Sequence, residues 1–196
     1  MSTPPPLLYY IRHGETDWNV EWRLQGQRDI PLNALGRKQA RQNGVKVIET
    51  VPGVAAYDFV SSPLGRARET MEIARAAMGL NPTAYRVDDD LRELTFGEWE
   101  GFTLAELRKT QAELVAARAA DKWKFLPPGG ESYFQLSERI ATWVKKVDRD
   151  TVAVSHGGVG RVLVGLWTNM EPADIVAMDF PQDQFLLWKG GKVTWI

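Results

Sequence analysis

Residues 9–19 read YYIRHGETDWN, a short apolar run that ends at Arg12 and His13 and becomes polar immediately afterwards. A second run of this kind, residues 151–155 (TVAVS), ends at His156 and is followed by two glycines. Short uninterrupted apolar runs are typical of strands that are buried on both faces of a sheet. Ligands bind at the carboxyl ends of parallel strands in such sheets, so the chain's only two histidines are expected to form one site.

Strands and helices alternate along the rest of the chain. The pattern predicts strands at 7–11, 57–61, 83–87 and 151–155, a final hairpin of 185–188 and 193–196, and helices at about 37–49, 64–77, 103–124, 132–147 and 159–167. This alternation favours a mainly parallel sheet covered by helices on both faces, with an antiparallel edge at the C-terminus.

Composition excludes several classes of protein. The chain has 196 residues, which fits one large domain, and 44% of them are hydrophobic and 25% charged, as in ordinary soluble globular proteins. A net charge of −1 without charged blocks gives no reason to expect nucleic acid or an anionic membrane as a partner. The absence of cysteine excludes disulfides, thiolate ligands and a cysteine nucleophile. Residues 1–6 lack the pattern of a signal peptide and no apolar run could span a membrane, so a cytoplasmic protein is expected.

The residues around the two histidines suit phosphoryl transfer without a metal. A phosphate dianion needs several fixed donors, and the planar guanidinium of arginine can bind two of its oxygens; Arg12 and Arg66 both follow strand ends. Neutral imidazole is an adequate nucleophile near pH 7. Glu93 follows the third predicted strand and could protonate the leaving group, because repulsion from the phosphate favours its acid form. Glycines that would let backbone N–H groups approach the anion follow each histidine: Gly14, Gly157 and Gly158.

The motif RHGET at residues 12–16 resembles the defining motif of the histidine phosphatase superfamily, the phosphoglycerate-mutase-like proteins. The resemblance covers nearly the whole chain. Its further motifs are Asn19, Leu24–Gly26, Asp29–Leu32, Leu35–Gly36, Ser61–Pro63 with Arg66, Glu69 and Thr70, Glu93, Gly97–Gly101, Pro128–Ser132 and Ser155–Gly158.

This resemblance implies a role for each matching residue. His13 would be the nucleophile that becomes a phosphohistidine, and Glu93 would be the proton donor and later the base for water. The residues that would hold the phosphoryl group are Arg12, Arg66 and His156, and those that would touch the phosphate or nearby substrate are Asn19, Gln25, Gly26 and Gly157. The family works without metal or other cofactor. Its three-layer α/β/α sandwich implies a single domain over residues 1–196 with a helical cap segment at about 102–126.

Phosphatase and mutase activities use the same pocket in this family. The resemblance implies that mutases follow the glutamate with Arg-His-Tyr-Gly and carry an Arg-Arg pair in a longer insertion. Here Glu93 is followed by Leu-Thr-Phe-Gly, and the chain contains no Arg-Arg pair. The sequence therefore favours a phosphatase for small phosphorylated metabolites over a cofactor-dependent phosphoglycerate mutase, and both over a non-catalytic module that binds phosphorylated ligands. The sequence does not decide whether the protein forms a homodimer.

Three further features have two interpretations each. Trp18, Trp22 and Trp99 could line a substrate pocket or belong to the core. The lysines and arginines of the expected cap segment could form a solvated helix face, or one or two of them could reach a second anionic group of the substrate. Residues 88–90 (DDD) begin like an aspartate-based, magnesium-dependent phosphatase, but no glycine and hydroxyl residue follow, so a charged loop is expected.

Overall fold

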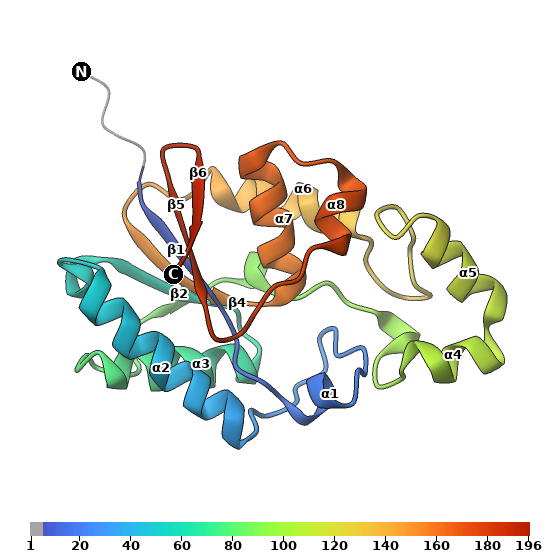
Figure 1. Cartoon of the computed structure of the whole chain (residues 1–196), viewed down its shortest axis with the longest axis horizontal. Helices are drawn as coiled ribbons and strands as arrows, with labels where there is room; N and C mark the ends of the chain where they lie inside the picture. Colours follow the sequence, from blue (N-terminus) through green and yellow to red (C-terminus); the bar gives the residue numbers. More distant parts are fainter. Residues whose placement is uncertain (1–5) are drawn as a thin grey trace.

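A six-stranded sheet forms the centre of the computed structural model, which describes residues 6–196 (Figure 1). The expectation that the chain start is no signal peptide concerns residues that lie almost entirely outside this range. The strands, in the spatial order β3-β2-β4-β1-β5-β6, are β1 (Leu8–Arg12), β2 (Asp58–Ser61), β3 (Arg86–Val87), β4 (Thr151–Ser155), β5 (Phe185–Lys189) and β6 (Lys192–Trp195). Strands β1 to β4 pair in parallel, whereas β5 and β6 form an antiparallel edge.

Helices cover both faces of this sheet, which confirms the predicted sandwich. The α-helices are α1 (Asp17–Val20), α2 (Ala34–Thr50), α3 (Gly65–Ala77), α4 (Leu104–Thr110), α5 (Ala112–Ala120), α6 (Tyr133–Val144), α7 (Gly157–Thr168) and α8 (Pro172–Ala177). Figure 1 shows α2 and α3 below the sheet, α6, α7 and α8 above it, and α4 and α5 beyond its edge. The short 3₁₀ helices are η1 (Val54–Ala56), η2 (Asp89–Leu91) and η3 (Gly97–Trp99).

Both faces of β1 are buried, which explains why its sequence is continuously apolar. Tyr9 and Ile11 pack into a core with α2 and α3, whereas Leu8 and Tyr10 pack into a second core with α6 and α7. Successive side chains of a strand point to opposite faces, so a strand between two helical layers has no polar face. The apolar run is therefore a consequence of the central position of β1.

The pairing of β1 with β4 brings the two histidines together. The strands run parallel in a register that sets Arg12 opposite Ser155. The next residues, His13 and His156, therefore leave the same edge of the sheet side by side, and the backbone N–H of His13 donates to the carbonyl of Ser155 at 2.9 Å. The prediction that they meet at one sheet edge is confirmed.

Several elements differ from the sequence-based prediction. The single helix predicted at 103–124 is two helices, because Gln111 leaves the helical conformation (φ −138°, ψ 46°), and its side chain accepts a hydrogen bond from the buried indole of Trp99. The third strand is only Arg86–Val87, at the sheet edge. The short helices α1 and α8 were not predicted. Four- and six-residue helices are too short to show an apolar period.

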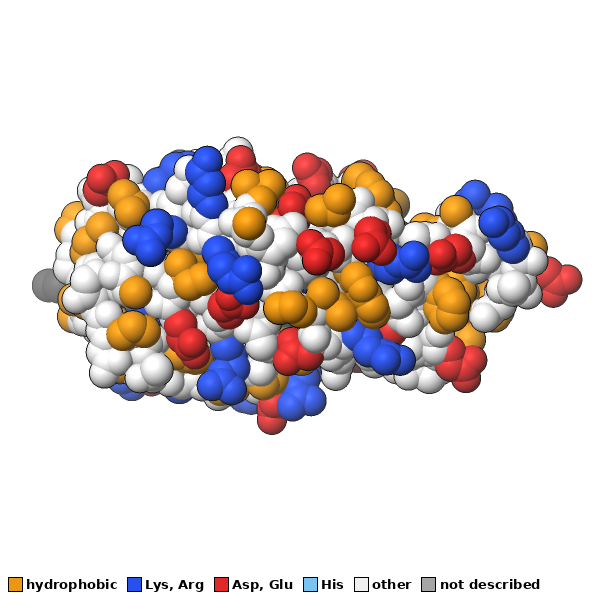
Figure 2. All heavy atoms as spheres, turned by 90° about the horizontal axis from the view of Figure 1, so that it is seen from below, with side chains coloured by type: hydrophobic (Ala, Val, Ile, Leu, Met, Phe, Trp, Pro, Cys, Tyr) orange, Lys and Arg blue, Asp and Glu red, His pale blue; other side chains and the backbone are white. Residues whose placement is uncertain are grey.

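The surface carries both signs of charge. Figure 2 shows acidic and basic side chains interspersed on the face seen from below, with apolar groups between them. Within residues 6–196, no helix combines the length and the apolar character that a membrane crossing requires.

The crossing of α2 and α3 depends on the small size of Gly44. A Cβ atom at this position would lie 2.4 Å from the carbonyl oxygen of Ala74, which belongs to rigid helix backbone. Gly44→Ala should gain up to about 1 kcal/mol of helix propensity. Overpacking should cost about 1–3 kcal/mol, so we expect a net loss of stability. Urea unfolding measures it, with the exposed Gln42→Ala as control. A variant more stable than the parent would contradict this account.

Candidate active site

The two histidines form a buried pair at the carboxyl edge of the sheet. Their ring centroids are 5.1 Å apart with the planes inclined at 61°, and the residues are 3% and 0% exposed. The hydroxyl of Tyr10 fixes the backbone of His156 by donating to its carbonyl at 2.6 Å and accepting from its N–H at 2.9 Å. Backbone pairing and this side chain together hold both rings in place.

The contacts of His13 define its tautomer. Its Nδ1 lies 2.8 Å from the carbonyl oxygen of Gly14, which can only accept, so Nδ1 carries the proton. In the neutral ring, Nε2 then has the lone pair, and it accepts a hydrogen bond from Nε of Arg66 at 3.2 Å. The unprotonated Nε2 of His13, which can act as a nucleophile, therefore faces the guanidinium of Arg66.

Arg66 is held by carbonyl groups rather than by a carboxylate. It is 1% exposed at the start of α3, and its terminal nitrogens donate to the carbonyls of Arg28 at 2.6 Å and Gly26 at 2.7 Å. Carbonyl contacts fix the guanidinium but leave its full charge available to an anion. Burial lowers the pKa of Arg66 to about 10, so it remains charged at neutral pH.

Unpaired polar atoms surround the histidine pair. Among the described residues, Nε of Arg12, Oε1 of Gln25 and Nδ1 of His156 are buried without a hydrogen-bond partner. A terminal guanidinium nitrogen of Arg12 donates to the carbonyl of Phe180 at 2.5 Å and holds this side chain in place. The opposite nitrogen of His156 lies 2.7 Å from Oγ of Ser62. Buried polar atoms are normally paired, so such a cluster fits a site that a polar ligand completes.

The surroundings keep both histidines neutral. Burial, followed by repulsion from Arg66 and Arg12, lowers the pKa of His13 well below 6.5, and burial, Arg66 and His13 do the same for His156. Burial also lowers the pKa of Arg12, with repulsion from Arg161 as the second cause. The positive charge of the site thus resides on arginines, and the imidazole nitrogen stays free to bind an electrophile.

Glu93 lies at the N-terminus of α7. One carboxylate oxygen accepts from the backbone N–H of Gly158 at 3.0 Å and the other from the N–H of Leu94 at 3.0 Å. A Cβ at position 158 would lie 2.3 Å from the carboxylate, so glycine is required for this approach. The expectation that the N–H of Gly158 is open to an anion is therefore wrong, because Glu93 already occupies it.

The structure also explains the glycine at position 14 differently from the sequence-based expectation. Its N–H donates to Oγ1 of Thr70 at 3.1 Å, so it is not available to a phosphate. A Cβ would lie 2.2 Å from the carbonyl oxygen of Gly36. Gly14 allows the loop after β1 to cross the start of α2.

A cavity of about 140 Å³ lies over this pair. It is lined by His13, by the predicted residues Arg12, Arg66, Glu93, Asn19, Gln25, Gly26 and Gly157, and by Arg23, Leu24, Leu94, Phe96, Tyr133 and Arg161. The amide oxygen of Asn19 accepts from the N–H of Thr16 at 3.1 Å and from Gln182 at 3.2 Å, which leaves its NH₂ group for the cavity. The structure thus brings every predicted site residue to one place, with His156 directly behind His13.

Several residues that shape this cavity were not predicted from the sequence. Arg161 lies one turn into α7 from Gly157, and this i, i+4 spacing was a usable signal. Gln182 donates to the carbonyl of His13 at 3.1 Å, and Tyr133 lines the wall. Both come from segments remote in sequence, where no local pattern marks them.

The three tryptophans do not line the cavity, and the aspartate run is part of a charged loop. Trp99 is fully buried in a small core under α4 and α5, Trp22 is 85% exposed, and neither they nor Trp18 line the cavity, so the pocket interpretation is wrong. Asp88 pairs with Arg86 and accepts from Trp143, which confirms the charged loop. Within residues 6–196, no three histidine, aspartate or glutamate side chains cluster as metal ligands would.

Comparison with known proteins identifies the class. Residues 8–185 match the histidine phosphatase superfamily (branch 1), and the chain belongs to this family. It is 35% identical to phosphoglycerate mutase-like protein 4 of Arabidopsis thaliana over 80% of this chain and 68% of that protein. It is 33% identical to the uncharacterized phosphatase PhoE of Bacillus subtilis over 79% and 73%. The crystal structure of α-ribazole phosphatase from Shigella flexneri superposes with a TM-score of 0.81 at 26% identity, over 96% and 93% of the two chains.

The lowered histidine pKa values can be measured directly. In phosphate-free buffer, the Cε1–H NMR signals of both histidines should titrate well below pH 6.5, because burial and the arginines oppose protonation. The unfolded chain binds more protons in that range, so the free energy of unfolding should fall as the pH drops below about 6.5. The spectrum of His156→Asn assigns the signals. A midpoint at the ordinary value would contradict the description of the site.

Proposed function

We propose that the protein is a metal-independent phosphatase that hydrolyses small phosphomonoesters through a phosphohistidine intermediate on His13. The observation that carries the proposal is the neutral, oriented Nε2 of His13 next to the guanidinium of Arg66 at 3.2 Å. A nucleophile and a fixed positive charge at this distance suit attack on a phosphorus whose oxygens are held by the arginine.

In the proposed first step, Nε2 of His13 forms a bond to phosphorus while the ester oxygen leaves. The guanidinium groups of Arg12 and Arg66 hold the non-bridging oxygens and compensate their charge. The ring of His156 packs against that of His13, and its unpaired Nδ1 can donate to a third oxygen when it carries the proton. The hydrogen bond from Nδ1 of His13 to Gly14 stabilises the positive charge that develops on the attacking ring.

Glu93 is the proposed proton donor to the leaving alkoxide. It lines the cavity beside the arginines, and it is the only carboxylate among the residues that line it. After the alcohol departs, the same carboxylate is placed to take a proton from the water that attacks phosphohistidine, so that the acid becomes the base. The products are the alcohol and inorganic phosphate, and His13 is regenerated neutral.

The mutase alternative rests on the names of relatives such as phosphoglycerate mutase-like protein 4. The phosphatase proposal is supported by Leu94–Gly97 after Glu93 in place of the mutase pattern, by the absence of an Arg-Arg pair from the sequence, and by the phosphatases among the relatives. Incubation with 3-phosphoglycerate, with and without 2,3-bisphosphoglycerate, separates the two. Release of inorganic phosphate supports the phosphatase, whereas isomerisation that depends on the bisphosphate supports the mutase.

His13→Ala should abolish the covalent intermediate and lower kcat by at least about a thousandfold, because the nitrogen that attacks phosphorus is removed. Rapid quenching with ³²P-labelled ester should show label on the parent protein that survives alkali and is lost in acid, as expected of a phosphoramidate. The exposed Gln42→Ala serves as control. Activity should persist in excess EDTA. Unchanged turnover in His13→Ala, or loss of activity with EDTA, would overturn the mechanism.

Glu93→Gln should affect esters according to their leaving group. For alkyl phosphates, loss of the proton donor should lower kcat/KM by about 10²–10⁴-fold. For p-nitrophenyl phosphate, whose phenolate leaves without protonation, the loss in the phosphorylation step should be much smaller. Equal losses for both substrates would show that Glu93 does not protonate the leaving group.

A further inference from the structure

Three cations gather where the segment after the cap helices meets the main body. Arg118 is on α5, Lys122 follows that helix, and Arg161 is on α7. All three surround Tyr133: Nζ of Lys122 lies 5.7 Å from the ring centroid, and a terminal nitrogen of Arg161 lies 3.5 Å from the hydroxyl. Burial and then repulsion from Arg118 and Arg161 lower the pKa of Lys122 to about 8.

We define Arg118, Lys122 and Arg161 as the cationic cluster. None of the three forms an ion pair within 4.0 Å among the described residues. Glu131 lines the same crevice, but Arg139 binds it at 2.8 Å. Like charges brought together without a counter-ion destabilise a fold, so an external anion would relieve the repulsion.

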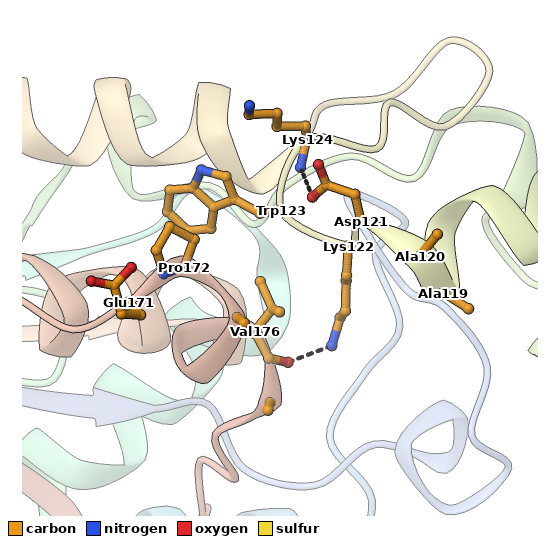
Figure 3. Close-up of a pocket in the computed structure, with 11 residues that line it drawn as sticks. Ala119, Ala120, Asp121, Lys122, Trp123, Lys124, Glu171, Pro172 and Val176 are labelled. Atoms are coloured by element: carbon orange, nitrogen blue, oxygen red, sulfur yellow. Dashed lines mark hydrogen bonds between the residues drawn. The ribbon is translucent and has the colours of Figure 1, made fainter.

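Backbone carbonyls hold the cations in a row that ends at the phosphate site. Lys122 donates to the carbonyl of Val176 at 2.6 Å, Arg161 to that of Met178 at 2.6 Å and Arg12 to that of Phe180 at 2.5 Å. Figure 3 shows Lys122 reaching across to Val176. Successive anchors are two residues apart in the chain and so at most about 7 Å apart, and the anchor of Arg161 lies between those of Lys122 and Arg12.

The cavity over His13 and the cationic cluster adjoin each other. A narrow crevice lined by Arg118 and Lys122 shares the wall of Leu94, Phe96 and Tyr133 with the cavity over His13. The guanidinium of Arg161 lines that cavity, and a Cβ on Gly157 would lie 3.5 Å from it and 3.3 Å from the guanidinium of Arg12. A group bound to Arg161 is therefore a near neighbour of a phosphate bound to Arg12.

The other cations of this region do not share these properties. Lys109 and Lys124 are exposed, as expected of a solvated helix face, whereas Arg118 and Lys122 are half-buried. The open hollow of about 590 Å³ on the outer side of Lys122 (Figure 3) is lined by Asp121 and Glu171 as well as lysines, so charges of both signs occur there. Arg161 is the member of the cluster that lines the cavity over His13.

We propose that Arg161, Lys122 and Arg118 form a second anion subsite that binds a carboxylate or a second phosphate on the leaving alcohol of the phosphomonoester. This deepens the proposed function and rests on it for the position of the scissile phosphate. The preferred substrate class is then a phosphomonoester whose alcohol carries another anionic group, not an ester of a neutral alcohol. Arg161 is nearer to the phosphate and suits short alcohols, and Lys122 and Arg118 suit longer ones.

The test compares substrates that differ only in the second anion. The carboxylate arm pairs 3-phosphoglycerate with sn-glycerol 3-phosphate, and the phosphate arm pairs fructose 1,6-bisphosphate with fructose 6-phosphate. In at least one arm, kcat/KM should favour the more anionic member, and Lys122→Gln or Arg161→Gln should reduce that preference by about tenfold or more, the size of one charge-assisted hydrogen bond. Lys122→Arg should restore it. Lys124→Gln, two residues from Lys122 but exposed, should leave it unchanged.

Binding separates this proposal from the proposed function. Calorimetry on His13→Ala measures the affinity for the same ligand pairs without turnover, and thermal unfolding shows whether each variant is folded. A preference that falls in the Lys122 or Arg161 variants supports the subsite even if no ester is hydrolysed. If neither arm shows a preference in the parent protein, or if Lys124→Gln lowers it equally, the subsite is wrong, whereas phosphate release through His13 would still stand.

Discussion

The parallel pairing of β1 with β4 is the constraint on which the rest of the molecule depends. One backbone register sets Arg12 opposite Ser155 and so brings His13 and His156 out of the sheet together, with ring centroids 5.1 Å apart. A shift of one residue would point every side chain of β1 to the opposite helical layer. The packing of both cores therefore fixes the geometry of the site with the same precision as it fixes the sheet.

The candidate active site concentrates positive charge in a buried place, and backbone carbonyls stabilise the buried cations by accepting their hydrogen bonds. Arg66 donates to two carbonyls of the loop at 26–28, and Arg12, Arg161 and Lys122 donate to carbonyls of residues 176–180. Carbonyls satisfy the hydrogen-bond donors without cancelling the charge, as carboxylates would. The positive charge of these side chains is therefore retained, while burial lowers the pKa of both histidines and keeps them neutral.

The sequence was informative where a pattern is local. The strands at 8–12 and 151–155 and the final hairpin of β5 and β6 follow from periodicity and turn chemistry. It was misleading where a tertiary contact overrides propensity. Gln111 breaks a segment that has good helix formers on both sides, because its side chain satisfies a buried indole.

By itself, the sequence determined the family, the sandwich fold and the residues that gather at the sheet edge, because short motifs at strand ends must share that edge. Only the tertiary structure decided how these residues are used. It showed that Gly14 serves packing, that the N–H of Gly158 binds Glu93, and that Nε2 is the unprotonated nitrogen of His13. It also revealed Arg161, Lys122 and Gln182 around the cavity. The reason is physical: tautomers, neighbours across the fold and uncompensated charge depend on contacts between residues far apart in the chain.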